Sequence, residues 1–299
     1  MQLGIFAKTF VRPNLEETLD AVKSFGLECV QFNFSCVGMP TLPHVIEPEL
    51  AQRIRGELAK RSLSMAAVSG TCNLIHPDEA HRADGIRRLG TLIASCRELG
   101  TSIVTLCTGT RDPDDMWRAH PENQSPDAWR DLRMSLETLL PVAEKHRVSL
   151  GVEPEPGNVI DSARKARRLL DEFKSPWIKI IFDGANLVAS HGLSKQHPIL
   201  SEAADLLGPD IVLAHAKDLI GTNTQDAPGH VAAGKGKLDY LHFFSLLRKN
   251  GFEGPIILHG LSESEVSASI AFLREKLVRA AGGGEGPAKT HAIVQAGQP

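Results

Sequence analysis

The sequence predicts an α/β protein whose fold is a single-domain (β/α)8 TIM barrel. Short apolar runs alternate with longer amphipathic stretches, and this pairing repeats eight times along the chain. The runs lack the strict polar alternation of half-buried strands, as expected for parallel strands that are covered on both faces. No glycine-rich phosphate loop follows the first run, which disfavours the alternative fold, a doubly wound sheet.

The eight apolar runs are the predicted strands. In chain order they are Leu3–Phe10, Cys29–Phe34, Ser64–Ser69, Ser102–Thr108, Val148–Glu153, Ile178–Phe182, Ile211–His215 and Pro255–Leu258. Amphipathic segments of helical period alternate with them. These segments are Asn14–Phe25, Pro48–Arg61, Asp78–Leu99, Asp127–His146, Ser162–Phe173, Lys195–Leu207, Leu238–Lys249 and Glu263–Arg279. Eight strand–helix units in about 280 residues match the requirement of a (β/α)8 barrel.

Capping residues support several of these helix boundaries. Asn14, Ser125 and either Asp161 or Ser162 are the expected N-caps, because short polar side chains accept backbone N–H groups at a helix start. Glycines stand where three of the helices are expected to end: Gly26, Gly100 and Gly251.

The chain divides into a barrel and a tail. We assign residues 1–281 to the (β/α)8 barrel, the catalytic domain, and residues 282–299 to a flexible C-terminal tail. The tail is rich in Gly, Ala and Pro and has no sustained period, so a continued helix is not expected there.

Composition argues against several classes of protein. The net charge of -3 makes no electrostatic case for nucleic acid or for an anionic membrane, and no apolar run approaches the roughly 18 residues of a spanning helix. The start of the chain lacks the features of a signal peptide. The five cysteines include no CxxC pair, which indicates a reducing compartment. We therefore expect a cytoplasmic protein with a small-molecule substrate and no nucleic-acid or membrane partner.

Four consecutive predicted strands end in ionisable residues. They are Glu153, Asp183, His215 and His259, each placed directly after an apolar run. In a (β/α)8 barrel the carboxyl ends of the strands surround the active site. Buried carboxylates repel one another unless a cation lies between them, and a divalent metal ion removes that cost for the whole set. The sequence therefore predicts one metal ion held by these four residues. Mixed oxygen and nitrogen ligands suit Mn²⁺, our first choice, or Co²⁺, Fe²⁺ or Zn²⁺.

Other residues are candidates for substrate binding. The long loop after the fourth strand carries Arg111, Trp117 and His120, which combine a fixed cation, a stacking surface and a polar ring suited to a sugar. The alternative for Arg111 is an internal network of ion pairs with Asp112 and Asp115.

Two further candidates lie after the third and seventh strands. His76 either contacts substrate or caps the helix that follows it. Lys217 alternates with His215 and either points into the barrel, where it would hold a substrate oxygen or developing negative charge, or forms a salt bridge with Asp218 or a neighbouring loop.

Residues 1 to 279 resemble the xylose-isomerase-like barrels grouped as sugar phosphate isomerases/epimerases, with tagatose/psicose 3-epimerases and AP endonuclease type 2 enzymes as relatives. The segments that carry the resemblance are "GVEPEPGN" at Glu153, "FDGANL" at Asp183, "LAHAKD" at His215 and "GKGKLDYLHFFSLLRKNGFEGPIIL" before the last strand. The resemblance implies that these three residues are metal ligands, with the strand-eight residue as the fourth. It also implies a homodimer or homotetramer.

The chain departs from this family at two positions. Its epimerases usually end strand eight in a glutamate, where this chain has His259, and often carry a histidine where this chain has Asn186. Asn186 can hydrogen-bond a substrate hydroxyl but cannot act as a base. Glu263 or Glu265 could replace the missing glutamate, although both are also typical first-turn acids of a helix.

These observations predict a divalent-metal-dependent isomerase or epimerase of a sugar or sugar-like hydroxy-ketone that works through an enediolate. The catalytic residues would be Glu153, as ligand and principal base, with Lys217 and His259. A histidine that ligates the metal cannot return a proton, so the chemistry is expected to use one base. The alternative is a metal-dependent lyase or dehydratase acting on a 3-keto-sugar or inosose. More remote alternatives are an AP-site endonuclease and a non-catalytic sugar-binding barrel.

Overall fold

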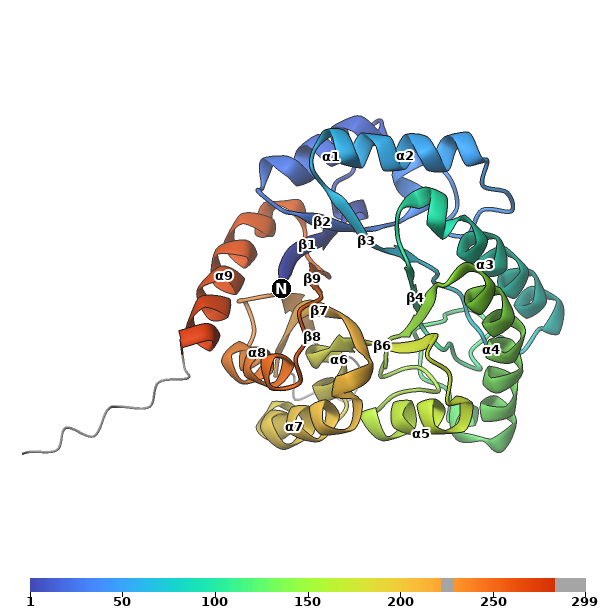
Figure 1. Ribbon diagram of the computed structural model, residues 1–299. Coiled ribbons are helices and arrows are strands. Elements are labelled where there is room, and N and C mark those ends of the chain that lie inside the picture. Colours follow the sequence, from blue (N-terminus) through green and yellow to red (C-terminus); the bar gives the residue numbers. More distant parts are fainter. Residues whose placement is uncertain (222–228, 283–299) are drawn as a thin grey trace, which may run out of the picture.

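The computed structural model describes residues 1–221 and 229–282, and in these residues the chain forms a closed barrel of eight parallel strands (Figure 1). The tail predicted for residues 282–299 lies outside the described residues from 283 onward. The barrel strands are β1 (Gln2–Phe6), β2 (Cys29–Phe32), β3 (Ser64–Ser69), β4 (Ile103–Leu106), β5 (Ser149–Val152), β6 (Ile178–Asp183), β7 (Ile211–Ile220) and β9 (Pro255–Leu258). Each strand pairs in parallel with its two neighbours, and the β1–β9 pairing closes the ring. The predicted fold class is confirmed.

A ring of helices surrounds the strands (Figure 1). The helices are α1 (Leu15–Ser24), α2 (Pro48–Lys60), α3 (Glu79–Leu99), α4 (Pro126–His146), α5 (Ala163–Phe173), α6 (Gly184–Ala189), α7 (Gln196–Leu207), α8 (Tyr240–Lys249) and α9 (Val266–Gly282). The side chains of Asn14 and Ser125 cap α1 and α4 as expected, whereas the Ser162 side chain makes no capping bond. Gly100 ends α3 with φ of 83°. The short α6 was not predicted, since six residues are too few to show a helical period.

Two apolar layers build the fold. The larger one lies between the strands and the surrounding helices, and a smaller cluster fills the inside of the barrel. The inner cluster comprises Phe6, Cys29, Ala67, Ile181, Leu213 and Ile257. Gly4 fits this crowded interior because a Cβ atom there would lie 2.5 Å from the Cys29 carbonyl oxygen. Because side chains fill the interior of the barrel, a substrate can bind only at one of its ends.

Two strands differ clearly from the prediction. The first was expected to run from Leu3 to Phe10, but β1 ends at Phe6 and Ala7–Thr9 form a 3-10 helix. β7 was expected to end at His215, but it continues to Ile220 and folds back as β8 (Gly229–Ala232), which pairs with it in the antiparallel sense. The extension persists beyond the barrel because β8 satisfies its backbone hydrogen bonds. The Asp218 carboxylate fastens this hairpin by accepting three backbone N–H groups, those of Leu219, Gly234 and Leu238.

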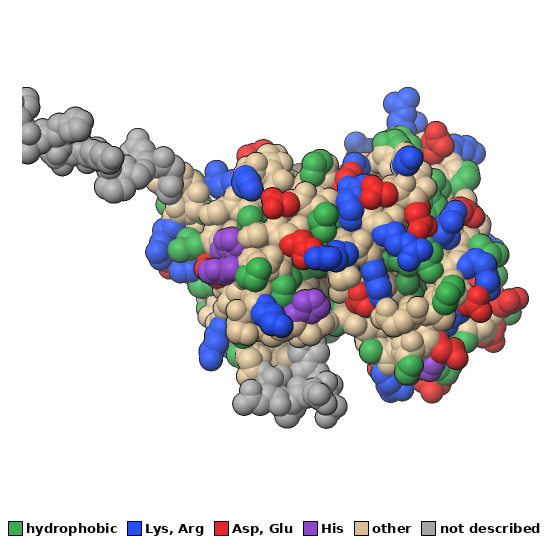
Figure 2. Space-filling model, turned by 90° about the horizontal axis from the view of Figure 1, so that it is seen from below, with side chains coloured by type: hydrophobic (Ala, Val, Ile, Leu, Met, Phe, Trp, Pro, Cys, Tyr) green, Lys and Arg blue, Asp and Glu red, His purple; other side chains and the backbone are tan. Residues whose placement is uncertain are grey.

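The outer surface carries charges of both signs in close mixture. Figure 2 shows this for the side of the barrel that bears α5 and α7, where Lys and Arg side chains lie among Asp and Glu. Within residues 1–221 and 229–282, no helix is long and apolar enough to cross a membrane.

Candidate metal centre

Three of the four predicted metal ligands meet at one end of the barrel. Glu153 directly follows β5, Asp183 ends β6, and His215 lies on β7 beside Asp183 in the strand register. One ligand atom from each of them lies within 4.8 Å of the others, and all three side chains are buried. This spacing is short enough for one ion to contact all three.

Hydrogen bonds hold this group in place. Oε1 of Glu153 lies 2.9 Å from Nδ1 of His215 and accepts a bond of 2.9 Å from the Asn186 amide. Nε2 of His215 lies 2.8 Å from the side-chain oxygen of Gln31, whose amide donates to Ser69. The Gln31 oxygen therefore keeps a proton on Nε2, which leaves Nδ1 as the nitrogen that can ligate a metal.

The carboxylate of Asp183 shows why the group suits a cation. Its Oδ1 accepts the backbone N–H of Asn186 at 2.9 Å. Its Oδ2 is buried and has no hydrogen-bond partner among the described residues, although Nζ of Lys217 lies 3.4 Å away and Nδ1 of His215 3.8 Å away. A buried carboxylate oxygen without a hydrogen bond is costly, and a metal ion would remove the cost. The residues present therefore fit a divalent ion.

The ionisable groups of the centre shift one another's pKa values. Burial by itself would raise the pKa of Glu153, but the electrostatic interaction and hydrogen bond with His215, together with the charge of Lys217, lower it to about 2. Burial raises the pKa of Asp183, with Lys217 opposing the rise. Burial and the charge of Glu153 raise the pKa of Glu155 to about 8. Burial opposes the charge of Lys217, yet the surrounding carboxylates raise its pKa overall. Glu153 is therefore ionised and able to accept a proton or bind a cation.

The fourth predicted ligand, His259, lies beside this group. Its ring stacks on His215, with centroids 5.0 Å apart and 14° between the planes, and on Phe6 at 5.4 Å. The lone pairs of stacked rings lie in parallel planes rather than converging on one point. Nδ1 of His259 is buried and has no partner among the described residues. Metal ligation by His259 stays a prediction.

A large pocket opens above the candidate ligands. Its volume is about 1260 Å³, and Glu153, Lys217, His259 and Trp117 all line it. Trp117 is 52% exposed and stands at its outer part, on the loop after β4. Asn186 lies below, bonded to Glu153. The pocket thus joins the candidate ligands to two of the predicted substrate-binding residues, Lys217 and Trp117.

Three other predicted substrate residues do not line this pocket. Arg111 pairs with Asp131 at 2.7 Å and also donates to the backbone of Ile75. His76 accepts the backbone N–H of Asp78 and so helps to start α3, the alternative that the sequence had left open. His120 caps the short 3-10 helix Pro121–Gln124. Each of them holds together a loop at the barrel mouth.

The two acids considered as replacements for the missing glutamate are held elsewhere. Glu263 pairs with Arg12 at 2.9 Å. Glu265 forms a capping box with Ser262 and pairs with Lys235 at 2.7 Å. Neither lines the pocket, so their reading as first-turn acids is the one that the structure favours.

Among the polar residues that line the pocket and that sequence reasoning missed are Gln31, Glu155 and His230. Gln31 is the one polar residue within β2, a signal that could have been noticed. Glu155 follows Glu153 by two positions, and alternation of side chains could have placed both toward the mouth. His230 lies on β8, which was not predicted, and no sequence signal identified it.

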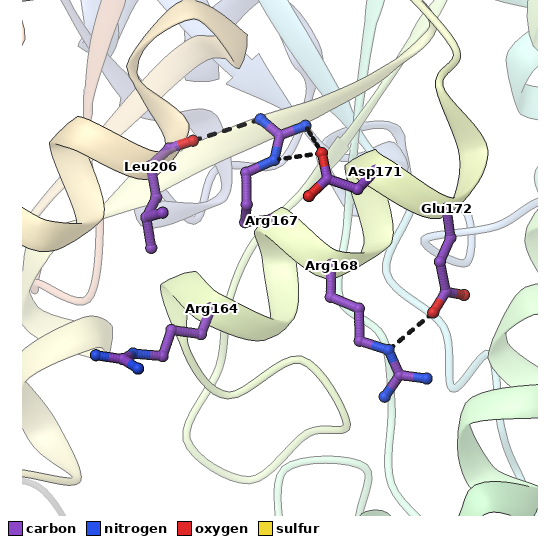
Figure 3. Close-up of a pocket in the computed structure, with 6 residues that line it drawn as sticks. All are labelled: Arg164, Arg167, Arg168, Asp171, Glu172 and Leu206. Carbon is purple, nitrogen blue, oxygen red and sulfur yellow. Dashed lines mark hydrogen bonds and ion pairs between the residues drawn. The ribbon is translucent and has the colours of Figure 1, made fainter.

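A second hollow lies away from the strand ends, on the outside of the barrel along α5 (Figure 3). Its volume is about 390 Å³, and three arginines line it. Each arginine is paired with a carboxylate: Arg164 with Glu202 at 2.6 Å, Arg167 with Asp171 at 2.8 Å and Arg168 with Glu172 at 2.8 Å. Because these charges are balanced, we place the functional site at the barrel mouth.

The closed (β/α)8 barrel and the cluster of Glu153, Asp183 and His215 at its mouth are consistent with one family of known proteins. Residues 19–276 match the sequence model of the family described as xylose isomerase-like TIM barrel, and the chain belongs to that family. The predicted relationship is confirmed.

Among curated proteins, the chain is similar to L-ribulose-5-phosphate 3-epimerase UlaE of Escherichia coli O1:K1 / APEC. The two are 26% identical over 204 residues, which is 66% of this chain. The matched region spans 64% of the length of UlaE, which is less than two thirds of that relative.

Solved structures show the same fold at lower identity. The apo form of 3-keto-D-glucoside 4-epimerase YcjR from E. coli superposes with a TM-score of 0.71 and 18% identity, covering 92% of this chain and 99% of that one. The IOLI protein, whose structure contains a zinc atom, superposes with a TM-score of 0.67 and 15% identity, covering 94% of this chain and 98% of that one.

Proposed function

We propose that this protein is a divalent-metal-dependent isomerase or epimerase of a sugar or sugar-like hydroxy-ketone that works through an enediolate, with Glu153 as principal base. The observation that carries the proposal is the convergence of Glu153, Asp183 and His215 around a buried carboxylate oxygen that lacks a hydrogen bond. The sugar-epimerase relatives support it.

Glu153, Asp183 and His215 would hold the ion, and Mn²⁺ is our first choice because mixed oxygen and nitrogen ligands suit it. The zinc atom in the structure of IOLI, a protein of the same fold, supports the proposal of a bound metal but does not select the ion. When bound, a divalent ion would polarise a substrate carbonyl and its neighbouring hydroxyl and so acidify the C–H bond between them.

The protein's own side chains then handle the proton and the charge. Asn186 and His215 both contact Oε1 of Glu153 and so orient the carboxylate that accepts the proton. The ammonium of Lys217 is buried and lines the pocket, where it would stabilise negative charge that develops on the substrate. The packed barrel interior below excludes water from one side.

One observation favours a second candidate, a lyase or dehydratase acting on a 3-keto-sugar or inosose-type substrate. Strand β9 delivers the imidazole of His259, where the family's epimerases usually present a carboxylate, and this imidazole stacks on His215. Loss of a second base beside the metal favours reactions that need only the first proton abstraction. Analysis of products separates the two chemistries, because elimination loses water and epimerisation does not.

Hydrogen exchange tests the proposal. Mn²⁺-loaded protein is incubated in D₂O with a panel of ketoses and a 3-keto-glucoside, and loss of C–H signals is followed by NMR. We expect exchange that is abolished by a chelator and falls by about 10² to 10⁴-fold in Glu153→Gln. The control is Glu144→Gln, an exposed glutamate on α4. Exchange that persists without metal, or in Glu153→Gln, would contradict the proposal.

A further inference from the structure

We infer that the pocket accepts an uncharged sugar ketone in preference to a sugar phosphate. This inference rests on the proposed function and narrows its substrate class. It also separates the chain from UlaE, whose name specifies a 5-phosphate. Four features of the pocket carry it: its cations, its acids, the loops at its rim and its unpartnered polar atoms.

The cations of the pocket are mostly committed to the protein's own acids. Lys217 is buried 3.4 Å from Oδ2 of Asp183. Arg118 pairs with Asp112 at 3.1 Å. Lys8 is the one lining cation without an ion pair among the described residues, and its exposed ammonium lies 4.5 Å from the centroid of the Phe6 ring. The Arg118 side chain is likewise 60% exposed, and cations that contact water are weak anchors for a phosphate dianion.

The acids of the pocket oppose a second anion. Asp115 and Glu153 line it and Asp183 lies below them, so these three acids equal the lining cations in number. A bound divalent ion would supply positive charge, but at the reacting end, where the carbonyl and hydroxyl of the substrate would contact it. A phosphate at the far end of a ketose would find no such excess of positive charge.

Barrels of this type often bind phosphate after the seventh and eighth barrel strands, and several backbone donors among the described residues there are already bonded to carboxylates of the protein. In the hairpin that follows His215, the amides of Leu219, Gly234 and Leu238 donate to Asp218. After β9, the amide of Ser262 donates to Glu265. The protein's own carboxylates thus occupy these donors, and they would repel a phosphate there.

The polar atoms that remain available suit hydroxyl groups. Nε2 of His230 and Nδ1 of His259 are buried, have no partner among the described residues, and belong to rings that line the pocket. Burial and the nearby charge of Lys217 lower the pKa of His230 to about 4, so its ring is neutral at pH 7. A neutral imidazole nitrogen forms a hydrogen bond with a sugar hydroxyl, which can donate or accept, and offers no charge to a phosphate.

Matched pairs of compounds test the inference. Full-length Mn²⁺-loaded protein is assayed in D₂O with L-ribulose, D-tagatose and D-fructose, and with L-ribulose 5-phosphate, D-tagatose 6-phosphate and D-fructose 6-phosphate. For each ketose that exchanges, we expect kcat/KM to exceed that of its phosphate ester by about tenfold or more. An ester processed as well as its free ketose, or better, would overturn the inference while leaving the proposed function intact. Exchange with none of the six would count against the proposed function itself.

A substitution of His230 tests whether this residue binds a sugar hydroxyl. His230→Ala should raise KM for the preferred ketose by about fivefold to a hundredfold, which corresponds to loss of one hydrogen bond, and His230→Gln should recover part of the loss. Mn²⁺ affinity should not change in either variant. The control is His146→Ala, at the end of α4. If the His230→Ala and wild-type proteins have equal KM values, His230 does not contact the sugar.

Discussion

Oε1 of Glu153 lies 2.9 Å from Nδ1 of His215, and the second nitrogen of the same ring lies 2.8 Å from the side-chain oxygen of Gln31. These contacts orient the imidazole from both sides. Since Gln31 accepts the proton of Nε2, Nδ1 is the nitrogen that faces the carboxylates and that a cation would bind in place of a proton. Gln31 on strand β2 therefore orients a candidate metal ligand, His215, on strand β7.

Gln31→Leu should weaken metal binding by about tenfold to a hundredfold, the usual effect of removing a hydrogen bond to a metal-ligating histidine. Isothermal titration of metal-free protein with Mn²⁺ measures this. Gln52→Leu, an exposed glutamine on α2, is the control. If both variants bind Mn²⁺ as the wild-type protein does, Gln31 does not orient His215.

Metal itself should stabilise the fold. An ion that binds only the folded chain adds about 2.7 kcal/mol to the free energy of unfolding at a concentration one hundred times its Kd. Thermal unfolding with and without Mn²⁺ tests this, and Asp183→Asn should abolish most of the gain. An equal gain in both proteins would mean that the ion binds elsewhere.

Lys217→Met should destabilise the metal-free protein strongly, because Asp183 would lose the ammonium 3.4 Å away while staying buried. Removing one partner of a buried ion pair costs about 3 to 5 kcal/mol. The matched control is Lys249→Met, whose exposed pair with Asp205 should contribute about 0 to 1 kcal/mol. Denaturant unfolding measures the free energy of unfolding of both variants. Similar decreases would show that the buried Lys217–Asp183 pair contributes no more than the exposed one.

Acid should weaken the metal-free fold through His230. Its pKa is lowered to about 4 in the folded protein, against 6.5 as the ordinary value, so the unfolded chain binds the proton first as the pH falls. Because protonation then favours the unfolded chain, the free energy of unfolding falls as the pH is lowered from about 6.5 to 4. Between pH 7 and 4 the wild-type protein should lose roughly 2 to 3 kcal/mol more than His230→Gln. Parallel pH dependence of the two proteins would contradict this.

Trp117→Ala should impair substrate binding without weakening the fold. Its ring is 52% exposed at the outer part of the pocket, where it can stack on a sugar ring. We expect KM to rise about tenfold, with kcat and the free energy of unfolding nearly unchanged. Met134→Ala, at an exposed position on α4, should change none of these. A fall in kcat with constant KM would assign Trp117 a different role.

The pattern of the sequence was sufficient to predict the barrel. A parallel strand buried on both faces appears as a continuous apolar run, and each covering helix appears as a 3.6-residue hydrophobic period. The pattern was also sufficient to bring Glu153, Asp183 and His215 together, because parallel strands that close into a barrel place their carboxyl ends round one mouth.

The tertiary structure alone decided what each remaining side chain touches. His259 directly follows its strand as expected, yet only packing determines that its ring stacks on His215. Arg111 pairs with Asp131 on α4, a contact between distant segments that no local pattern encodes, whereas His76 and His120 each accept a backbone N–H two residues further along their own loops. His230 reaches the pocket through a hairpin whose pairing depends on Asp218, and Gln31 reaches His215 across the barrel. Local periodicity determines which residues form an element and which face of it is buried, whereas the partner that a polar side chain meets depends on the closing of the whole barrel.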